Sequence, residues 1–349
     1  MSVRHLMREN IQNLEPYRCA RDEAGEGLRI YLDANENYAP LVDCDGINRY
    51  PDSSNLCVRR AVESVFGFPS DMVCAGNGSD ELIDILLRIF CTPAVDSILV
   101  FPPTYGEYSV LASINDVRVI ECPLEKDFSI NLDQALSLIR THRPKLVFIC
   151  SPNNPTGNLF DRDVILTIAR ENPAVTVVDQ AYVDFAPHGA LTPADVEANE
   201  RLVILRTLSK AWALAGARIG FMLSSREIAS KCYDVKYPYN IPLPSQREAV
   251  LALSGREDCE RRIRTIIASR KSLMERISRL AGVVEVLDSD ANFFLVRFRD
   301  AGMVYSELKR RGIVVRDRSS NLHCEGCLRI TVGSPQECDE LVRALEEIL

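Results

Sequence analysis

The sequence contains no apolar stretch long enough to cross a bilayer as a helix. Its first residues, MSVRHLMRENIQNLEPY, also lack the apolar core and small-residue cleavage site of a secretory signal. Positive charge is not in excess, because 41 lysine and arginine residues face 49 acidic residues and the formal net charge is −8. These absences predict a cytoplasmic protein that binds neither a membrane nor nucleic acid.

A second cysteine pair is also lacking. The segment HCEGC places His323, Cys324 and Cys327 close together, but a zinc site usually takes its ligands from two such groups. The twelve cysteines are otherwise scattered, and several lie in apolar runs such as VFIC. We therefore expect reduced cysteines and no metal site, and the role of the His323/Cys324/Cys327 cluster stays open.

Two nucleotide-binding motifs are absent from CAGNGSDEL. Glu81 occupies the position of the third glycine of GxGxxG, and no Gly-Lys-Ser/Thr follows. What remains is a glycine-containing turn that opens an amphipathic helix, and the N-terminus of such a helix suits a phosphate. A capped helix, with Ser79 as N-cap and Asp80 and Glu81 complementing the helix dipole, is the favoured explanation of this segment when it is taken alone. Acidic side chains argue against a phosphate here unless they point elsewhere.

Continuous apolar runs alternate with helical patterns along the first two thirds of the chain. Such runs are typical of strands buried on both faces, so the sequence predicts an α/β fold with a mostly parallel sheet covered by helices on both faces. After the proline-rich YPYNIPLPSQ, shorter strands predict a smaller α/β domain. We expect an N-terminal segment, 1–30, that packs with the small domain, a large cofactor-binding domain, 31–237, and the small domain, 238–349.

Four segments that follow predicted strands carry the groups that a pyridine aldehyde phosphate needs. RTLSKAWALAGARIG offers a lysine for covalent attachment, and TVVDQAY a carboxylate for the ring nitrogen. CSPNNPTG and PPTYGEY offer an amide donor and a ring for stacking. Each residue alone has a structural explanation as a cap, a turn former, core packing or a salt bridge, but their joint presence in this order favours one bound cofactor. The residues are Lys210, Asp179, Tyr182, Asn154, Tyr105, Thr207, Ser209 and Arg218.

The segments SPNNPTG, DQAY and SKAWALAGARIG resemble those of the fold type I pyridoxal-phosphate aminotransferases, and the resemblance covers nearly the whole chain. NIQNLEPY, LDANEN, RYPD, GNGSDE, ANFFLVRF, GIVVRD and CLRITVG resemble the histidinol-phosphate aminotransferase subfamily. The resemblance implies a catalytic lysine, Lys210, which binds pyridoxal 5'-phosphate. It assigns Asp179 to the pyridine nitrogen, and Asn154 and Tyr182 to the phenolic oxygen.

The same resemblance assigns the remaining cofactor and substrate contacts. Ser79 and Asp80 would meet the phosphate through their backbone, beside Thr207, Ser209 and Arg218. The family is homodimeric, and Tyr50 would reach the phosphate of the neighbouring subunit's cofactor. Tyr17, Arg316 and Arg329 would bind histidinol phosphate in one half-reaction and glutamate or 2-oxoglutarate in the other, since guanidinium groups suit both phosphates and carboxylates.

Two positions depart from the family pattern, and other functions stay possible. Gln180 stands where an acidic residue is common, and Tyr237 where proline is common. An aromatic amino-acid aminotransferase and a threonine-phosphate decarboxylase would use the same cofactor groups. A dinucleotide-dependent dehydrogenase is disfavoured by the failed GxGxxG. A non-catalytic binding protein would not need Lys210, Asp179 and Asn154 together.

Overall fold

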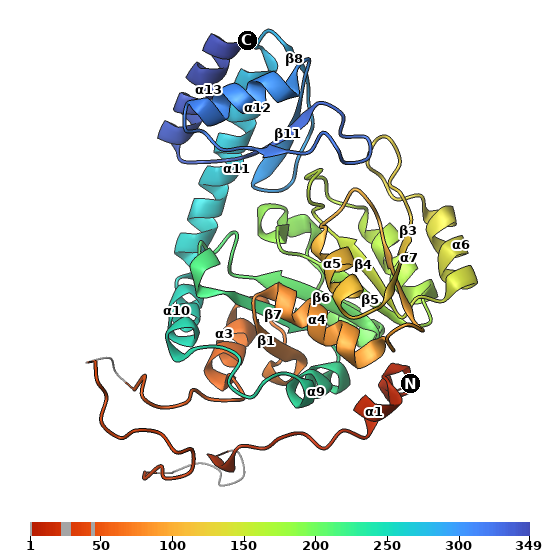
Figure 1. Cartoon of the computed structure of the whole chain (residues 1–349), viewed down its shortest axis with the longest axis vertical. Helices are drawn as coiled ribbons and strands as arrows, with labels where there is room; N and C mark the ends of the chain where they lie inside the picture. Colours follow the sequence, from red (N-terminus) through yellow and green to blue (C-terminus); the bar gives the residue numbers. More distant parts are fainter. Residues whose placement is uncertain (1, 22–28, 43–45) are drawn as a thin grey trace. The chain divides into compact units, whose positions relative to one another are not determined.

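The computed structural model (Figure 1) describes residues 2–21, 29–42 and 46–349. These residues fall into two compact units. Unit 1 is formed by 1–96, 111–118 and 191–256, and unit 2 by 97–110, 119–190 and 257–349. The domain boundaries expected after residues 30 and 237 stay a prediction. The described contacts of the first residues are with unit 1, where the Val3 N–H donates to Glu227 and the Arg8 N–H donates to the Ile89 carbonyl.

Unit 1 contains three strands in the order β1-β7-β6. Its helices and strands are η1 (Arg4–Leu6), α1 (Glu9–Gln12), α3 (Leu56–Phe66), η2 (Ser70–Met72), β1 (Val73–Asn77), α4 (Ser79–Phe90), α8 (Pro193–Ala198), β6 (Leu202–Thr207), η5 (Ala215–Ala217), β7 (Ile219–Leu223), α9 (Arg226–Val235) and α10 (Leu243–Ser254). The amphipathic helix expected after the glycine-containing turn of CAGNGSDEL is α4. Its leucine and isoleucine residues at helical spacing are buried, which explains why their spacing in the sequence predicts a helix.

β7 is antiparallel to both of its neighbours, β1 and β6. The connection between β6 and β7, residues 208–218, is too short for the crossover helix that a parallel pair requires. This connection carries Lys210 and Arg218. The chain therefore turns back directly after β6, and the candidate lysine lies in the turn.

Unit 2 contains the parallel strands of the fold. Its helices and strands are β2 (Ser97–Val100), α5 (Glu107–Ile114, whose last residues belong to unit 1), β3 (Arg118–Glu121), α6 (Leu132–His142), β4 (Leu146–Cys150), α7 (Arg162–Glu171), β5 (Val175–Asp179), η3 (Val183–Phe185), η4 (Pro187–Gly189), α11 (Arg256–Ser278), β8 (Val283–Val286), β9 (Phe293–Phe298), α12 (Ala301–Arg310), β10 (Arg316–Asp317), β11 (Cys327–Thr331) and α13 (Pro335–Ile348). β4 pairs in parallel with both β2 and β5, and every residue of these three strands is buried, as their continuous apolar runs predict.

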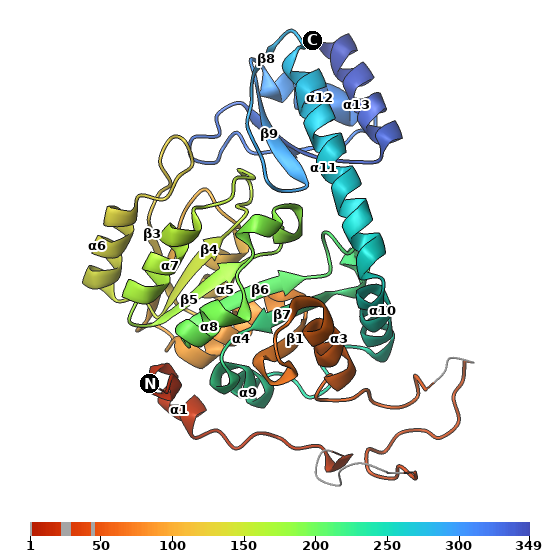
Figure 2. The same cartoon turned by 180° about the vertical axis from the view of Figure 1, so that it is seen from behind.

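The C-terminal part of unit 2 is a second sheet with the order β10-β11-β9-β8, antiparallel throughout. One face of this sheet packs against α11, α12 and α13, and Figure 2 shows these helices beside the strands. Leu328 and Ile330 of β11 point into this core and are almost wholly buried. Because side chains alternate along a strand, Arg329 lies on the opposite face.

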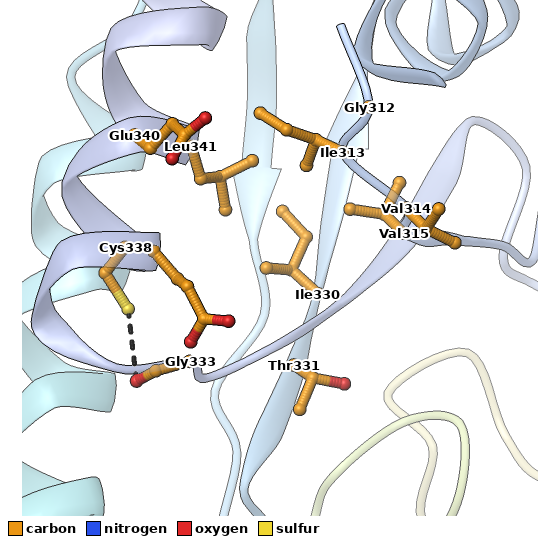
Figure 3. A pocket seen from close by; sticks show the side chains of 11 residues that line it. Gly312, Ile313, Val314, Val315, Ile330, Thr331, Gly333, Cys338, Glu340 and Leu341 are labelled. Carbon is orange, nitrogen blue, oxygen red and sulfur yellow. Dashed lines mark hydrogen bonds between the residues drawn. The ribbon is translucent and has the colours of Figure 1, made fainter.

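A pocket of about 450 Å³ lies between β11 and α13. Figure 3 shows Ile313, Ile330 and Leu341 lining its apolar side, with Glu340 at its edge. None of the predicted cofactor or substrate residues lines this pocket.

None of the helices formed by the described residues has both the length and the hydropathy that crossing a membrane demands. The cysteines among the described residues form no disulfide bond with one another. Within the same ranges, no group of three or more histidine, cysteine, aspartate or glutamate residues is placed to hold a metal ion.

The start of α13 generates a stability prediction. Ser334 and Glu337 form a capping box, in which the Ser334 hydroxyl accepts the Glu337 N–H and the Glu337 carboxylate accepts the Ser334 N–H at 2.7 Å. Replacing Ser334 with alanine is expected to lower the free energy of unfolding by about 1 kcal/mol. Urea denaturation would measure this. Ser320→Ala, at an exposed turn position, serves as control and should change stability by less than about 0.5 kcal/mol. Equal effects of both substitutions would contradict the capping role.

Candidate cofactor and substrate site

The N-terminus of α4 is capped by glycine. Gly78 is the N-cap, with φ 80°, and Ser79 is the first helical residue, so the alternative in which Ser79 caps the helix is wrong. Glu81 does not face the helix terminus alone, since its carboxylate accepts hydrogen bonds from the Asn77 N–H and from Asn240 Nδ2 at 2.8 Å. The acidic side chain that argued against a phosphate here is therefore bound to its own strand and to a loop of unit 1.

β7 passes unusually close to this helix terminus. A Cβ atom on Gly220 would lie 2.3 Å from the Ser79 nitrogen, a separation that no side chain tolerates. A Cβ on Gly78 would lie 2.5 Å from Nη2 of Arg218. The two glycines thus allow the backbone of β7 and the Arg218 guanidinium to approach the first turn of α4.

The predicted phosphate ligands of unit 1 gather at this point. Nη2 of Arg218 lies 3.4 Å from Asp80, and Nη1 donates to the Ser209 hydroxyl at 3.5 Å. The Ser209 hydroxyl lies 3.0 Å from that of Thr207. The next residue, Lys210, is exposed at the surface of unit 1. The structure thus brings together hydroxyl, guanidinium and helix N–H groups that suit a phosphate.

A buried carboxylate holds the segment that carries Tyr50. Glu36 accepts from Arg21 at 2.7 Å, from Arg49 at 2.8 Å and from the Tyr50 N–H at 2.6 Å. Burial alone would raise the pKa of Glu36, but these hydrogen bonds outweigh it and lower the pKa to about 2. The Tyr50 ring stacks on Tyr239 with centroids 4.4 Å apart.

Tyr17 and Tyr50 remain accessible, with 75% and 50% of their surface exposed. Both were expected near a ligand, and among the described residues neither forms a hydrogen bond or a ring contact with the phosphate ligands of unit 1. Their placement at a ligand stays a prediction.

In unit 2, Asp179 ends β5 in a buried environment. The hydroxyl of Tyr108 donates to Asp179 Oδ2 at 2.8 Å, and the Ala181 N–H donates to Oδ1 at 3.0 Å. Tyr108 is wholly buried and stacks on Phe148 with centroids 4.8 Å apart. Burial, together with the Asp179 carboxylate, raises the pKa of Tyr108 well above its ordinary value. A neutral tyrosine therefore holds the carboxylate in place.

The loops after β4 and β2 are joined by a residue that the sequence did not single out. Asn153 donates to the Pro103 carbonyl at 2.8 Å and accepts from the Thr104 hydroxyl at 2.9 Å. This fixes the loop that carries Tyr105, whose ring packs edge-on against Tyr108. In the fingerprint SPNNPTG the first asparagine is thus structural.

Asn154, Tyr182 and Arg329 form a connected group. Asn154 Nδ2 lies 3.5 Å from the Tyr182 hydroxyl, and Nη1 of Arg329 donates to Asn154 Oδ1. The Arg329 guanidinium also lies over the ring of Phe293, at 5.1 Å from its centroid. The amide and phenol expected at the cofactor's phenolic oxygen are thus linked to an arginine expected at the substrate.

Arg316 and Arg329 are directly opposite each other in the β10–β11 pair. Paired residues of antiparallel strands project from the same face, so the two predicted substrate arginines are neighbours. Arg329 has a lowered pKa because of burial, to which the positive charge of Arg316 adds. Neither arginine forms an ion pair with an acidic residue that the structure describes.

The two departures from the family pattern differ in their environments. Gln180 is buried, and its amide donates to the Gly189 carbonyl at 2.8 Å, which a carboxylate cannot do. Tyr237 is 71% exposed.

In the HCEGC segment, Arg297 donates to the carbonyls of His323 and Glu325, and burial raises the pKa of Cys324 to about 12. Arginine therefore braces this turn.

The fold and these residues can be set beside known proteins. The family model for aminotransferases of class I and II matches residues 20–345. A histidinol-phosphate aminotransferase from Cytophaga hutchinsonii is 42% identical over 345 residues, which is 99% of both chains. The chain belongs to the class I and II aminotransferase family. Solved histidinol-phosphate aminotransferases from Clostridium acetobutylicum and Sinorhizobium meliloti superpose with TM-scores of 0.79 and 0.77, over 87% and 86% of this chain and 91% and 83% of theirs, at 24% and 25% identity.

The second of these structures is in complex with pyridoxal-5'-phosphate. This class I and II aminotransferase is dependent on pyridoxal phosphate, as the family is. Its own residues fit that group. In unit 1 a cradle that a Cβ would fill surrounds the α4 terminus, and in unit 2 a buried carboxylate is braced by Tyr108. The fold type expected from the sequence is confirmed.

The Glu36 contacts predict a pH dependence of this aminotransferase's N-terminal segment. The folded pKa of about 2 lies below the ordinary 4.5, so the stabilisation is complete above about pH 4.5 and is lost as the pH falls towards 2. Glu36→Gln should raise hydrogen exchange around Tyr50 about fivefold at neutral pH, as the loss of about 1 kcal/mol requires, and should abolish its acid dependence. Glu197→Gln, at an exposed position of α8, is the control. An unchanged acid dependence in the Glu36 variant would refute this role.

The hydroxyl of Tyr108 generates a second prediction. Tyr108→Phe keeps the stacking on Phe148 but removes the hydroxyl that donates to Asp179 Oδ2, so the free energy of unfolding should fall by about 1–3 kcal/mol. Denaturant unfolding of the cofactor-free chain would measure it. Tyr305→Phe, on α12, removes a hydroxyl for which no hydrogen bond is found among the described residues and should cost less than about 0.5 kcal/mol. A Tyr108→Phe protein as stable as the parent would show that the hydrogen bond contributes nothing.

Proposed function

We propose that this aminotransferase transfers the amino group of L-histidinol phosphate to 2-oxoglutarate, giving imidazole acetol phosphate and glutamate, in histidine biosynthesis. The relative from Cytophaga hutchinsonii that bears this name is 42% identical over 99% of both chains, and this full-length similarity carries the proposal. The exchange of amino groups is reversible and alternates between the two substrates at one cofactor.

The cofactor-binding roles follow the residues described above. Ser79, Asp80, Thr207, Ser209 and Arg218 bind the cofactor phosphate in unit 1, where their backbone and side-chain donors converge.

The ring of the cofactor is bound by residues of unit 2. Asp179 would pair with the pyridine nitrogen, Asn154 and Tyr182 would donate to the phenolic oxygen, and Tyr105 would stack on the ring. When bound, pyridoxal phosphate supplies an aldehyde and an electron-withdrawing ring.

Lys210 has two tasks. Its Nζ would hold the cofactor covalently, and as a free amine it would accept the proton from the carbon that bears the substrate amino group. Tyr108, which donates to the Asp179 carboxylate, would hold it towards the ring nitrogen.

Arg316 and Arg329 bind the anionic end of the substrate, and Tyr17 closes over it. Two adjacent guanidinium groups without an acidic partner among the described residues attract an anion, and they accept either a phosphate or a carboxylate. This duality suits an enzyme that alternates between histidinol phosphate and glutamate.

A homodimer with shared active sites completes the proposal. The segment 30–50 carries a row of exposed apolar side chains, among them Leu32 at 92%, Tyr38 at 84% and Leu41 at 99%. Exposed apolar surface of this extent is typical of a face that a partner covers. We assign that face to a second copy, whose cofactor phosphate Tyr50 reaches. The division into segment 1–30 and domains 31–237 and 238–349 is proposed on the same family resemblance. A cytoplasmic location is proposed on the scattered cysteines.

Lys210→Ala should fold but not transaminate. Far-ultraviolet circular dichroism would report the fold, and loss of the visible absorbance of the lysine-bound cofactor would report the missing attachment. Turnover should fall at least about 10³-fold, because the covalent attachment and the proton acceptor are both lost. Lys309→Ala, an exposed position on α12, should behave as the parent. Retained turnover in the Lys210 variant would remove the assignment.

A single half-reaction tests the substrate. Cofactor-loaded protein is mixed with L-histidinol phosphate, L-phenylalanine or threonine phosphate without a keto acid, and the cofactor absorbance is followed. Rapid conversion with histidinol phosphate alone supports the proposal. Conversion mainly by phenylalanine identifies an aromatic aminotransferase, and release of carbon dioxide from threonine phosphate identifies a decarboxylase.

A further inference from the structure

A third guanidinium lies beside the two predicted substrate arginines. Arg318 follows Arg316 by two residues, and its N–H donates to the Cys327 carbonyl at 2.9 Å, so the pairing of β10 with β11 continues to it. Side chains two residues apart project from the same face of a strand. Arg316, Arg318 and Arg329 therefore share the face opposite the helical core that Leu328 and Ile330 enter.

Arg318 has no structural partner that explains its position. Its Nε is buried without a hydrogen-bond partner, and no ion pair or side-chain hydrogen bond of Arg318 is found within residues 2–21, 29–42 and 46–349. Arg297, on the same sheet, instead pairs with Glu285 and binds two carbonyls. A buried donor without an acceptor costs free energy, and its presence indicates a ligand that supplies the acceptor.

The charges around Arg318 repel it. Burial lowers the pKa of Arg318, and the positive charges of Arg329 and Arg316 lower it further. The other groups near it are Tyr182 and Cys324, whose pKa values are raised, chiefly by burial, so both are neutral near pH 7. Among the described residues, three positive charges on one face, beside the neutral Tyr182 and Cys324, make a site for more than one negative charge.

We propose that Arg318 is a specificity-determining residue that binds the phosphate of the substrate as a third guanidinium and so favours a phosphorylated amine over a carboxylate. This inference rests on the proposed function. A carboxylate carries one charge and two oxygens, which a single guanidinium binds through two parallel hydrogen bonds. A phosphate monoester above its second pKa of about 6 carries two charges and three acceptor oxygens, and it uses the additional donors.

Arg318→Gln tests this in two separate half-reactions of the cofactor-loaded enzyme. The second-order rate constant with L-histidinol phosphate should fall about 10- to 100-fold, the loss expected for a charged hydrogen bond, while that with L-glutamate should change less than about threefold. Arg318→Lys keeps the charge and should lie between. Arg343→Gln, an exposed arginine on α13, is the matched control and should change neither rate constant. Inorganic phosphate, used as a competitive inhibitor, should bind about tenfold more weakly to Arg318→Gln.

The outcomes separate this proposal from the one on which it rests. If the parent enzyme does not react with histidinol phosphate, the proposed function fails. If it reacts, and Arg318→Gln lowers both rate constants equally or lowers neither, the role of Arg318 fails alone.

The ratio of the two rate constants is measured from pH 5 to 8. In this ratio, the effects of enzyme groups that titrate identically with both substrates cancel. In the parent the ratio should rise as the phosphate becomes doubly charged, and in Arg318→Gln the rise should be reduced. A melting temperature within a few degrees of the parent's shows that the variant is folded, and the lysine variant supplies the same comparison if it is not.

Discussion

The backbone of β7 touches the first turn of α4 at a separation that only glycine allows. At Gly220 a Cβ would meet the Ser79 nitrogen at 2.3 Å, and at Gly78 it would meet Arg218 at 2.5 Å. Arg218, two residues before Gly220, has φ 56°, so the chain turns sharply as it enters β7 and presents its guanidinium to the helix terminus. A larger residue at either glycine would separate the strand, the helix dipole and the cation that together suit a phosphate.

The antiparallel direction of β7 follows from the short connection between β6 and β7. The connection 208–218 returns directly after β6 and brings Ser209, Lys210 and Arg218 to one end of the strands of unit 1. A helical crossover would have spread these residues over a longer path. The short return therefore explains why the lysine and the phosphate ligands occupy one contiguous stretch of sequence.

Much of this arrangement could be predicted from the sequence, because it depends on the local pattern of apolar and polar residues. The buried strands β4, β5 and β6 and the helix α4 follow from apolar runs and helical spacing, and Asp179, Asn154 and Lys210 stand out because polar residues follow such runs. The antiparallel direction of β7 was not foreseen, because a run of buried residues does not record strand direction. Tyr108 was also missed, since a tyrosine within a helical pattern reads as core packing and its hydroxyl's partner lies 71 residues away.

The sequence did not reveal the contacts by which several polar residues hold others in place. Asn153 ties one loop to another, Glu36 gathers two arginines and the Tyr50 amide, and Gln180 binds the Gly189 carbonyl. Each satisfies backbone or charged groups that folding removes from water, so its role follows from burial and becomes visible only when the partners are known.

The arginines beside β10 and β11 differ from these structural residues. Arg316, Arg318 and Arg329 lack acidic partners among the described residues and repel one another. Folding alone gives no reason to gather three such charges on one face. A ligand with compensating negative charge does, and that ligand offsets the cost only while it is bound.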